Sequence, residues 1–404
     1  MNPREGFLPY GRHVIDDDDI AAVVDALKSD FLTTGPRVRE FERALEIATD
    51  ARHAIACANG TAALHLAARA LNLGPGTVSI VPSVTFLATA NAVRLNGGEV
   101  VFADVDADSG LMRPRDLEEA ISRCPDGHAD AVFPVHLAGQ TGDQAGIFNV
   151  ARHNNLRIVE DACHALGTRV SHGDGEEFAV GSCKYSDLTC FSFHPVKAIA
   201  MGEGGAVTAD DPTLASIILR DRTHGMNRDP ESFVLDSEAF DDARQANPWY
   251  YEMESPGLNY RIPDVLCALG ASQLRKLDTF SARRRGLVAR YDALLRNLSP
   301  HVQLLARTAN TTAAWHLYVA LIDFDALGFS RGQVMRELAA KGIGTQVHYL
   351  PVHRQPYYRD LNPFTTLPGA DAYYRRTLSL PLFPSMSDED PKRVTDTLAT
   401  ILKL

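Results

Sequence analysis

The sequence has few cysteines, no long apolar run and no histidine pattern typical of a metal site. Its 404 residues include six cysteines, none in a Cys-x-x-Cys pair, so we expect reduced thiols rather than a disulfide framework. No stretch of about 18 consecutive apolar residues occurs, so no transmembrane helix is predicted. The 14 histidines form no His-Glu-x-x-His spacing, and we expect no metal centre.

Basic residues are also in deficit. The chain has 40 Lys and Arg against 51 Asp and Glu, which gives a net charge of −11. Surfaces that bind nucleic acid or anionic membranes need basic patches, so this balance argues against both partners. The N-terminus lacks an apolar stretch of signal-peptide length. These features predict a cytoplasmic protein.

Strand-like apolar segments alternate with helical patterns through the first two-thirds of the chain, which predicts an α/β fold with a mostly parallel sheet. The length suits two domains, and we expect a large domain over residues 1–255 and a smaller α+β domain over 256–404. In the second part, helical patterns cover 263–298, 331–341 and 388–402, with a strand over 315–324. The strands expected in the large domain are Ala54–Cys57, Val78–Pro82, Val100–Asp104, Ala131–His136, Arg157–Asp161, Leu188–Phe193 and Gly205–Ala209.

The segment Ser-Phe-His-Pro-Val-Lys ends at Lys197, just past the strand expected over 188–193 and before the turn Gly-Glu-Gly-Gly. A lysine amine is a nucleophile only when neutral, and burial lowers its pKa enough for carbonyl chemistry. Lys197 is therefore a candidate for a covalent bond with a carbonyl compound. The alternative is a solvated surface lysine, which is the usual position of this residue type.

Asp161 ends the strand expected over 157–161, and the carboxyl ends of strands are where open parallel sheets bind ligands. Pyridoxal phosphate (PLP) needs an acidic partner at its pyridine nitrogen, because the protonated ring is the electron sink. Asp161 and Lys197 together meet the needs of this cofactor. Taken alone, Asp161 is equally suited to cap a helix.

A phosphate site is expected at Gly60, Thr61 and Ala62, which open a helix directly after a strand. Free N–H groups at a helix N-terminus bind anions, and glycine lets the backbone approach closely. The alternative is an ordinary capped junction between strand and helix. Phe86 follows another strand and could stack on a flat ring, although a buried core position is the commoner place for phenylalanine.

In this order the four motifs resemble the DegT/DnrJ/EryC1/StrS family of PLP-dependent sugar aminotransferases, over nearly the whole chain from Pro9 to Leu402. The resemblance implies the fold type I of PLP-dependent enzymes (aspartate aminotransferase-like), with a seven-stranded large domain. It also implies a homodimer with composite active sites. The Ser-Phe-His-Pro-Val-Lys and Thr-His-Gly-Met motifs are similar to the subfamily that aminates a UDP-linked 4-keto-6-deoxy-N-acetylhexosamine on the route to pseudaminic acid.

The resemblance implies a role for each matching residue. Lys197 matches the lysine that bonds the cofactor, Asp161 the partner of the ring nitrogen, and His164 a group near the phenolic oxygen. The implied cofactor contacts are Gly60, Thr61, Ala62, Phe86, Asp161, His164, Ser192, Lys197 and, from the neighbouring subunit, Asn259. The candidate substrate contacts are His194, Arg222, His224, His348 and Tyr349. Because the chain is acidic overall, a diphosphate must be met by local groups, for which we consider Arg222, His224, His348 and Arg354.

The implied reaction moves an amino group from glutamate to the C4 keto group of a nucleotide-linked 4-keto-6-deoxy sugar. GDP- and dTDP-linked sugars stay open as alternatives. Ala200-Met201 stands where relatives often have Thr-Thr, and the segments 171–177 and 228–254 look long for the family. A dehydratase on this scaffold is expected to replace Lys197 with histidine, and a non-enzymatic regulator to lose a catalytic residue or add a DNA-binding segment. A nicotinamide-dependent oxidoreductase would need a Gly-x-Gly-x-x-Gly after an early strand, which is not found.

Overall fold

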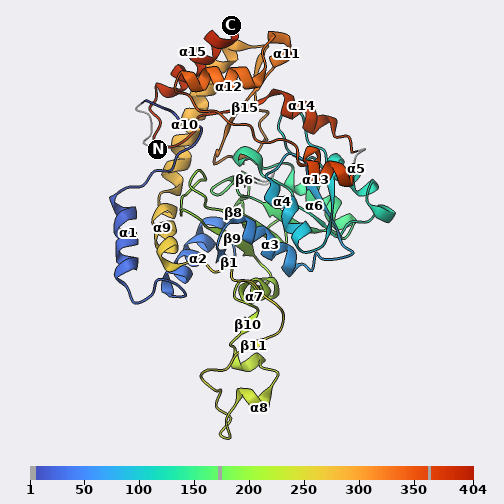
Figure 1. Cartoon of the computed structure of the whole chain (residues 1–404), viewed down its shortest axis with the longest axis vertical. Coiled ribbons are helices and arrows are strands. Elements are labelled where there is room, and N and C mark those ends of the chain that lie inside the picture. Colours follow the sequence, from blue (N-terminus) through green and yellow to red (C-terminus); the bar gives the residue numbers. More distant parts are fainter. Residues whose placement is uncertain (1–5, 172–174, 363–364) are drawn as a thin grey trace.

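The computed structural model describes residues 6–171, 175–362 and 365–404. At its centre is a seven-stranded sheet with the order β1-β9-β8-β5-β4-β2-β3 (Figure 1). Neighbouring strands from β3 to β8 are parallel, whereas β9 is antiparallel to both β8 and β1. The predicted α/β fold with a mostly parallel sheet is confirmed. The strands are β1 (His53–Cys57), β2 (Val78–Pro82), β3 (Glu99–Ala103), β4 (Ala131–Val132), β5 (Arg157–Asp161), β8 (Leu188–Ser192) and β9 (Gly205–Ala209).

Among the strands expected in the large domain, the one over 131–136 differs most from the structure. It ends at Val132, and Val135 forms only an isolated bridge with Asp161. Pro134 has no N–H group to donate to a neighbouring strand, which explains why regular pairing stops before it. Its carbonyl oxygen still accepts from the Asp161 N–H at 2.8 Å, so the chain stays beside β5.

Helices cover both faces of the sheet, and the alternation of side chains along each strand explains how. On β2, Ile80 belongs to the cluster packed under α5 and α6, whereas the next residue, Val81, belongs to the cluster packed under α3 and α4. Successive side chains of a strand point to opposite faces, so a strand with apolar residues at both positions is covered twice. The helices of this part are α1 (Asp17–Lys28), α2 (Pro36–Thr49), α3 (Gly60–Ala70), α4 (Leu87–Leu95), α5 (Pro114–Ser122), α6 (Gln144–His153) and α7 (Pro212–Asp221).

The helical pattern expected over 263–298 is two helices, α9 (Asp264–Leu274) and α10 (Leu277–Leu295). The first packs against α1 and α2, and the second against α15. A three-stranded antiparallel sheet of order β12-β14-β15 follows, and the division of the chain near Ser255 stays a prediction. The remaining elements here are β12 (Val302–Leu304), β13 (Thr311–Thr312), β14 (Tyr318–Ile322), α11 (Phe324–Leu327), α12 (Arg331–Ala340), α13 (Pro356–Leu361), α14 (Pro368–Arg376), β15 (Thr377–Leu380) and α15 (Asp390–Leu402).

The two segments that look long for the family have different structures. Part of the first pairs as β6 (Arg169–Ser171) with β7 (Glu177–Ala179), and its residues 172–174 lie outside the described part of the chain. The second projects away from the body of the molecule beyond α7 (Figure 1). It contains α8 (Asp236–Ala239) and β11 (Glu252–Met253), and β11 pairs with β10 (Met226–Asn227), which directly precedes the segment.

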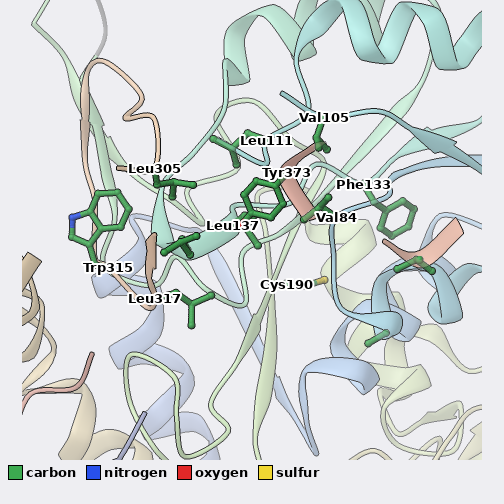
Figure 2. Close-up of a cluster of buried hydrophobic side chains, with 14 of the residues drawn as sticks. Val84, Val105, Leu111, Phe133, Leu137, Cys190, Leu305, Trp315, Leu317 and Tyr373 are labelled. Carbon is green, nitrogen blue, oxygen red and sulfur yellow. The ribbon is translucent and has the colours of Figure 1, made fainter. Parts of the chain in front are cut away.

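The largest hydrophobic cluster joins the central sheet to the C-terminal elements. Figure 2 shows Phe133, Leu137, Trp315, Leu317 and Tyr373 drawn from both halves of the sequence into this cluster. Burying one such side chain stabilises the fold by about 1.5–3 kcal/mol, so the C-terminal part is held firmly against the carboxyl ends of the strands. No helix in the described residues is both long and apolar enough to cross a membrane.

Candidate active site

A cavity of about 630 Å³ opens at the carboxyl ends of the central strands. This is the edge at which open parallel sheets bind ligands. The cavity brings together predicted cofactor and substrate contacts that are far apart in the sequence. Those that line it are Gly60, Thr61, Phe86, Asp161, His164, Ser192, His194, Lys197, His348 and Tyr349.

Lys197 lies in the connection between β8 and β9, and its backbone N–H donates to the carbonyl oxygen of His194 at 2.8 Å. Burial lowers the pKa of its amine below the ordinary value of 10.5, while the nearby Cys163 and Asp161 oppose the shift. A lysine with a lowered pKa is neutral in a larger fraction of molecules at any given pH, and only the neutral amine attacks a carbonyl carbon. Lys197 is half-buried and lines the cavity, so it is not the fully solvated surface lysine considered as the alternative.

Asp161 is 5% exposed at the end of β5. One carboxylate oxygen accepts from the Thr89 hydroxyl at 2.7 Å, and the other from the Cys163 N–H at 3.2 Å. Each oxygen thus has one protein donor, although a carboxylate has about four acceptor positions. The structure leaves this carboxylate able to accept a further N–H group from the cavity.

The N-terminus of α3 lies at the cavity, where the phosphate site is expected, and one predicted contact needs correction. A Cβ atom at Gly60 would lie 2.7 Å from the Ser192 Cβ atom, so only glycine fits there. The N–H of Ala62 donates to the Asn59 side chain at 2.9 Å, and Ala62 does not line the cavity. The prediction that Ala62 contacts the phosphate is wrong because the helix cap already uses this group. Gly60, Thr61 and Ser192 all line the cavity.

Phe86 precedes α4 and is 56% exposed at the cavity. Its ring centroid lies 6.0 Å from that of Tyr349. The core position considered as an alternative is therefore excluded. An aromatic face that is open to a cavity suits a flat ring, because stacking removes apolar surface of both partners from water.

Three histidines that line the cavity, His164, His316 and His348, form one wall of it. The ring of His164 lies 4.3 Å from that of His316 and 6.4 Å from that of His348. Burial, followed by the charge of Lys197, lowers the pKa of His348 to about 3. Burial likewise holds the pKa of His164 and His316 well below the ordinary value. This wall is lined by neutral imidazoles at physiological pH. Sequence reasoning missed His316, which stands in a strand-like run with no motif around it.

Several predicted substrate residues are not brought to the cavity of their own chain. Arg222 is buried and donates to the Glu42 carboxylate at 2.7 Å and the Ala56 carbonyl oxygen at 2.6 Å. It is not available to a diphosphate, and this prediction is wrong. His224 is exposed but does not line the cavity. Asn259, which is expected to contact the cofactor phosphate of the neighbouring subunit, is exposed and does not line the cavity of its own chain.

Arg354 is also exposed, and it pairs with Asp371 at 3.5 Å. It does not line the cavity either. The candidates for meeting a diphosphate within a single chain are thus reduced to His348.

Sequence reasoning also missed Arg284, on α10. Its guanidinium is buried and donates to the carbonyl oxygens of Lys197 at 3.1 Å and Ala198 at 3.4 Å. Burial lowers its pKa to about 10. It is the middle one of three consecutive arginines, a run typical of a solvated helix face, so no local signal marks it. Arg284 fixes the backbone of the connection that carries the reactive lysine.

These groups fit PLP. The cavity contains an amine with a lowered pKa, a carboxylate with free acceptor positions, a glycine-lined helix N-terminus and an open aromatic face. They correspond to the aldehyde, ring nitrogen, phosphate and ring face of the cofactor. The described residues contain no cluster of three or more side chains able to hold a metal ion.

Comparison with known proteins agrees with this geometry. The model of the DegT/DnrJ/EryC1/StrS aminotransferase family matches residues 13–399. The chain is 37% identical over 406 residues to the spore coat polysaccharide biosynthesis protein SpsC of Bacillus subtilis, covering 100% of this chain and 99% of SpsC.

Two solved structures illustrate the likeness of the fold. Helicobacter pylori PseC, an aminotransferase involved in the biosynthesis of pseudoaminic acid, superimposes with a TM-score of 0.86 at 26% identity, covering 98% of this chain and 99% of PseC. The PLP form of Spr1654 from Streptococcus pneumoniae gives a TM-score of 0.84 at 28% identity, covering 98% of this chain and 99% of Spr1654. The expected fold and cofactor are thus confirmed.

Proposed function

The chain belongs to the DegT/DnrJ/EryC1/StrS aminotransferase family and is a PLP-dependent sugar aminotransferase, and from this premise we propose its reaction. It transfers an amino group from glutamate to the C4 keto group of a nucleotide-linked 4-keto-6-deoxy sugar, in the first instance a UDP-N-acetylhexosamine derivative. The observation that carries the reaction type is the presence of Lys197 and Asp161 in one cavity. Similarity to PseC and the Ser-Phe-His-Pro-Val-Lys motif support the choice of sugar.

The residues have separate tasks in this reaction. When bound, PLP supplies an electron sink for the charge that develops at the substrate carbon. Asp161 holds the protonated ring nitrogen, and Gly60, Thr61 and Ser192 hold the phosphate. Lys197 Nζ takes the proton from the α-carbon of glutamate and later delivers a proton to C4 of the sugar. Its lowered pKa suits it to act as a base at neutral pH.

We also propose that the active form is a homodimer. Asn259, implied by family resemblance to contact the phosphate, is exposed and does not line the cavity of its own chain. A contact from Asn259 therefore requires the neighbouring subunit. Closed twofold dimers are also the commonest oligomers.

The substrate is tested with a panel of keto sugars. Purified protein is incubated with PLP, glutamate and the UDP-N-acetyl, GDP or dTDP 4-keto-6-deoxy sugar, and release of 2-oxoglutarate is followed. The UDP-linked sugar is expected to react at least about tenfold faster, since a site that hydrogen-bonds a particular group rejects analogues lacking it.

Lys197→Ala sets the background of this assay. A faster reaction with the GDP or dTDP sugar would replace the proposed sugar and leave the reaction type intact. Turnover by Lys197→Ala at the wild-type rate would refute the reaction mechanism itself.

A further inference from the structure

A tight turn beside the cavity carries one backbone N–H group directly to His164. The turn is the short 3-10 segment Leu137–Gly139, in which Ala138 has a φ of 62°. Left-handed backbone is unfavourable for alanine and persists only where the surroundings enforce it. Here the Ala138 carbonyl oxygen accepts from the His316 N–H at 2.9 Å. A Cβ atom at Gly139 would lie 2.6 Å from the Ala314 carbonyl oxygen, so the two segments are locked together.

The contact fixes which nitrogen of His164 carries the proton. The Ala138 N–H points to His164 Nδ1 at 3.4 Å. A backbone amide only donates, so Nδ1 must present its lone pair. Burial and the nearby Lys197 and His348 hold the pKa of His164 well below its ordinary value, so the ring is neutral. A neutral imidazole has one N–H group, which here is at Nε2.

The protonation of His164 also fixes the direction of its hydrogen bond with Tyr349. The Tyr349 hydroxyl oxygen lies 3.1 Å from His164 Nε2, and it must accept from the N–H at that position. His164 has no carboxylate as a hydrogen-bond partner in the described part of the chain, so no group competes with Ala138 for Nδ1. Burial raises the pKa of Tyr349 well above 10, and its hydroxyl keeps its proton.

The hydroxyl proton of Tyr349 is consequently not used by His164. The side chain lines the cavity, and His164 is its one hydrogen-bond partner among the residues that the structure describes. We propose that Tyr349 donates a hydrogen bond to an oxygen atom of the bound ligand, and that the Ala138 N–H sets this direction through His164. That the accepting oxygen belongs to a sugar substrate rests on the proposed function.

Two ligand oxygens fit this chemistry. One is the carbonyl oxygen of the keto sugar, where a donated hydrogen bond draws electrons from the carbon that the amine attacks. The other is the phenolic oxygen of the cofactor. Both oxygens can accept a hydrogen bond from the Tyr349 hydroxyl.

The direction of the hydrogen bonds is measured first, without cofactor or sugar. The full chain is labelled with ¹⁵N-histidine, and the ring signals of His164 are assigned by their loss in His164→Gln. We expect the unprotonated type of shift at Nδ1 and the protonated type at Nε2. The opposite pattern would overturn the proposal, whatever reaction the enzyme catalyses. If the expected pattern is found but no keto sugar is turned over, the proposed function fails and the direction stands.

The donor is then removed or reversed in the holoenzyme. Tyr349→Phe keeps the ring and is expected to lower kcat roughly 10- to 100-fold with little change in KM, the usual effect of losing one such donor. His164→Gln can accept at one end and donate at the other, so it should keep clearly more activity than His164→Glu. His164→Glu accepts at both ends, which turns the Tyr349 proton away from the ligand, and it should resemble Tyr349→Phe.

A matched control is Tyr358→Phe, which removes a buried hydroxyl that has no hydrogen-bond partner among the described residues and does not line the cavity. It should leave kcat unchanged.

A change in the visible spectrum of resting Tyr349→Phe would assign the acceptor to the cofactor. An unchanged spectrum with a lowered kcat would assign it to the sugar. If neither spectrum nor kcat changes, or if His164→Gln and His164→Glu lose activity equally, the proposal is wrong.

Discussion

Glu160 and Asp161 are adjacent carboxylates on β5, and they are both buried, with 3% and 5% of their surface exposed. They point to opposite faces of the sheet, as successive strand residues do. Glu160 accepts from the side chains of Gln144 at 2.5 Å, Thr189 at 2.8 Å and Ser186 at 3.2 Å. Asp161 has a single protein donor at each oxygen and a cavity in front of it.

The difference shows how to separate a structural carboxylate from a functional one. A buried charge is tolerated when hydrogen bonds replace the water that it lost. Both oxygens of Glu160 accept hydrogen bonds from protein side chains, and His136 Nε2 lies 3.3 Å from one of them. No acceptor position is therefore free for a ligand. Asp161 is completed only when another group enters the cavity. Burial alone does not distinguish the two residues, but the number of donors does.

The largest expected effect comes from Asp161→Asn, which should lower activity roughly a thousandfold while the protein stays folded. An amide cannot hold a protonated ring nitrogen by charge. It can still fit, because the Thr89 hydroxyl can donate instead to the Phe86 carbonyl oxygen at 3.2 Å and accept from the new amide. Activity is measured with saturating PLP, and folding by thermal melting. Near-normal turnover would show that Asp161 does not act on the ring.

Glu160→Ala should have the opposite profile. It removes the acceptor of the half-buried Gln144 and the buried Thr189 and the charge partner of the buried His136, and breaking such a network costs about 3–5 kcal/mol. The free energy of unfolding, measured in urea, should fall by that amount, whereas kcat of the remaining folded enzyme should stay within a few-fold of wild type. A large loss of kcat with normal stability would remove the distinction drawn between the two carboxylates.

The local motifs of the sequence were enough to predict the α/β fold and to name Gly60, Asp161 and Lys197 as residues that meet at one cavity. Strand ends followed by Asp161, by Gly60 or by a turn carrying Lys197 are features of a few residues each, and a parallel sheet brings such ends to one edge. Local sequence also explains why β2, β5 and β9 have the predicted bounds. Their apolar runs are interrupted sharply by Gly, Pro or charged residues.

Contacts between distant segments could not be predicted in this way. Arg222 was assigned to a diphosphate, but Glu42, 180 positions away, holds it inside the fold. Thr89 reaches Asp161 across 72 positions, and Arg284 reaches Lys197 across 87. None of these pairs leaves a local pattern, because tertiary packing alone decides which polar groups meet.

The pH dependence of stability gives a further test of the difference between Glu160 and Asp161. Burial raises the pKa of Glu160, but the charge and hydrogen bond of His136 and the hydrogen bonds of Gln144 and Thr189 together bring it below the ordinary value of 4.5. A lowered pKa in the folded state means that the stabilisation is present above about pH 4.5 and is lost as the pH falls through the folded value. Unfolding free energy should therefore decline below pH 4.5 by up to about 1.4 kcal/mol per pH unit from this group.

Glu160→Gln has no carboxyl group at this position, so the contribution of Glu160 to the pH dependence should be absent. The comparison is made from urea unfolding curves of both proteins at pH 3 to 7. Equal slopes below pH 4.5 in wild type and variant would show that Glu160 is not stabilised as a carboxylate in the folded protein.

The smallest expected effects come from a matched pair of threonines, one beside each carboxylate. Thr89→Val and Thr189→Val both remove a buried hydroxyl that donates to a carboxylate, at 2.7 Å and 2.8 Å, and both keep the shape of the side chain. A hydrogen bond to a charged group contributes about 1.5–3 kcal/mol, and less where other donors remain. Thr189→Val should therefore lower the free energy of unfolding by about 1 kcal/mol without changing PLP retention, since Glu160 keeps its other donors. Thr89→Val leaves one Asp161 oxygen without its protein donor, and it should weaken PLP retention a few-fold, measured by the cofactor that remains after dialysis. If the two variants lose PLP equally, the number of donors around a buried carboxylate does not mark its function in this protein.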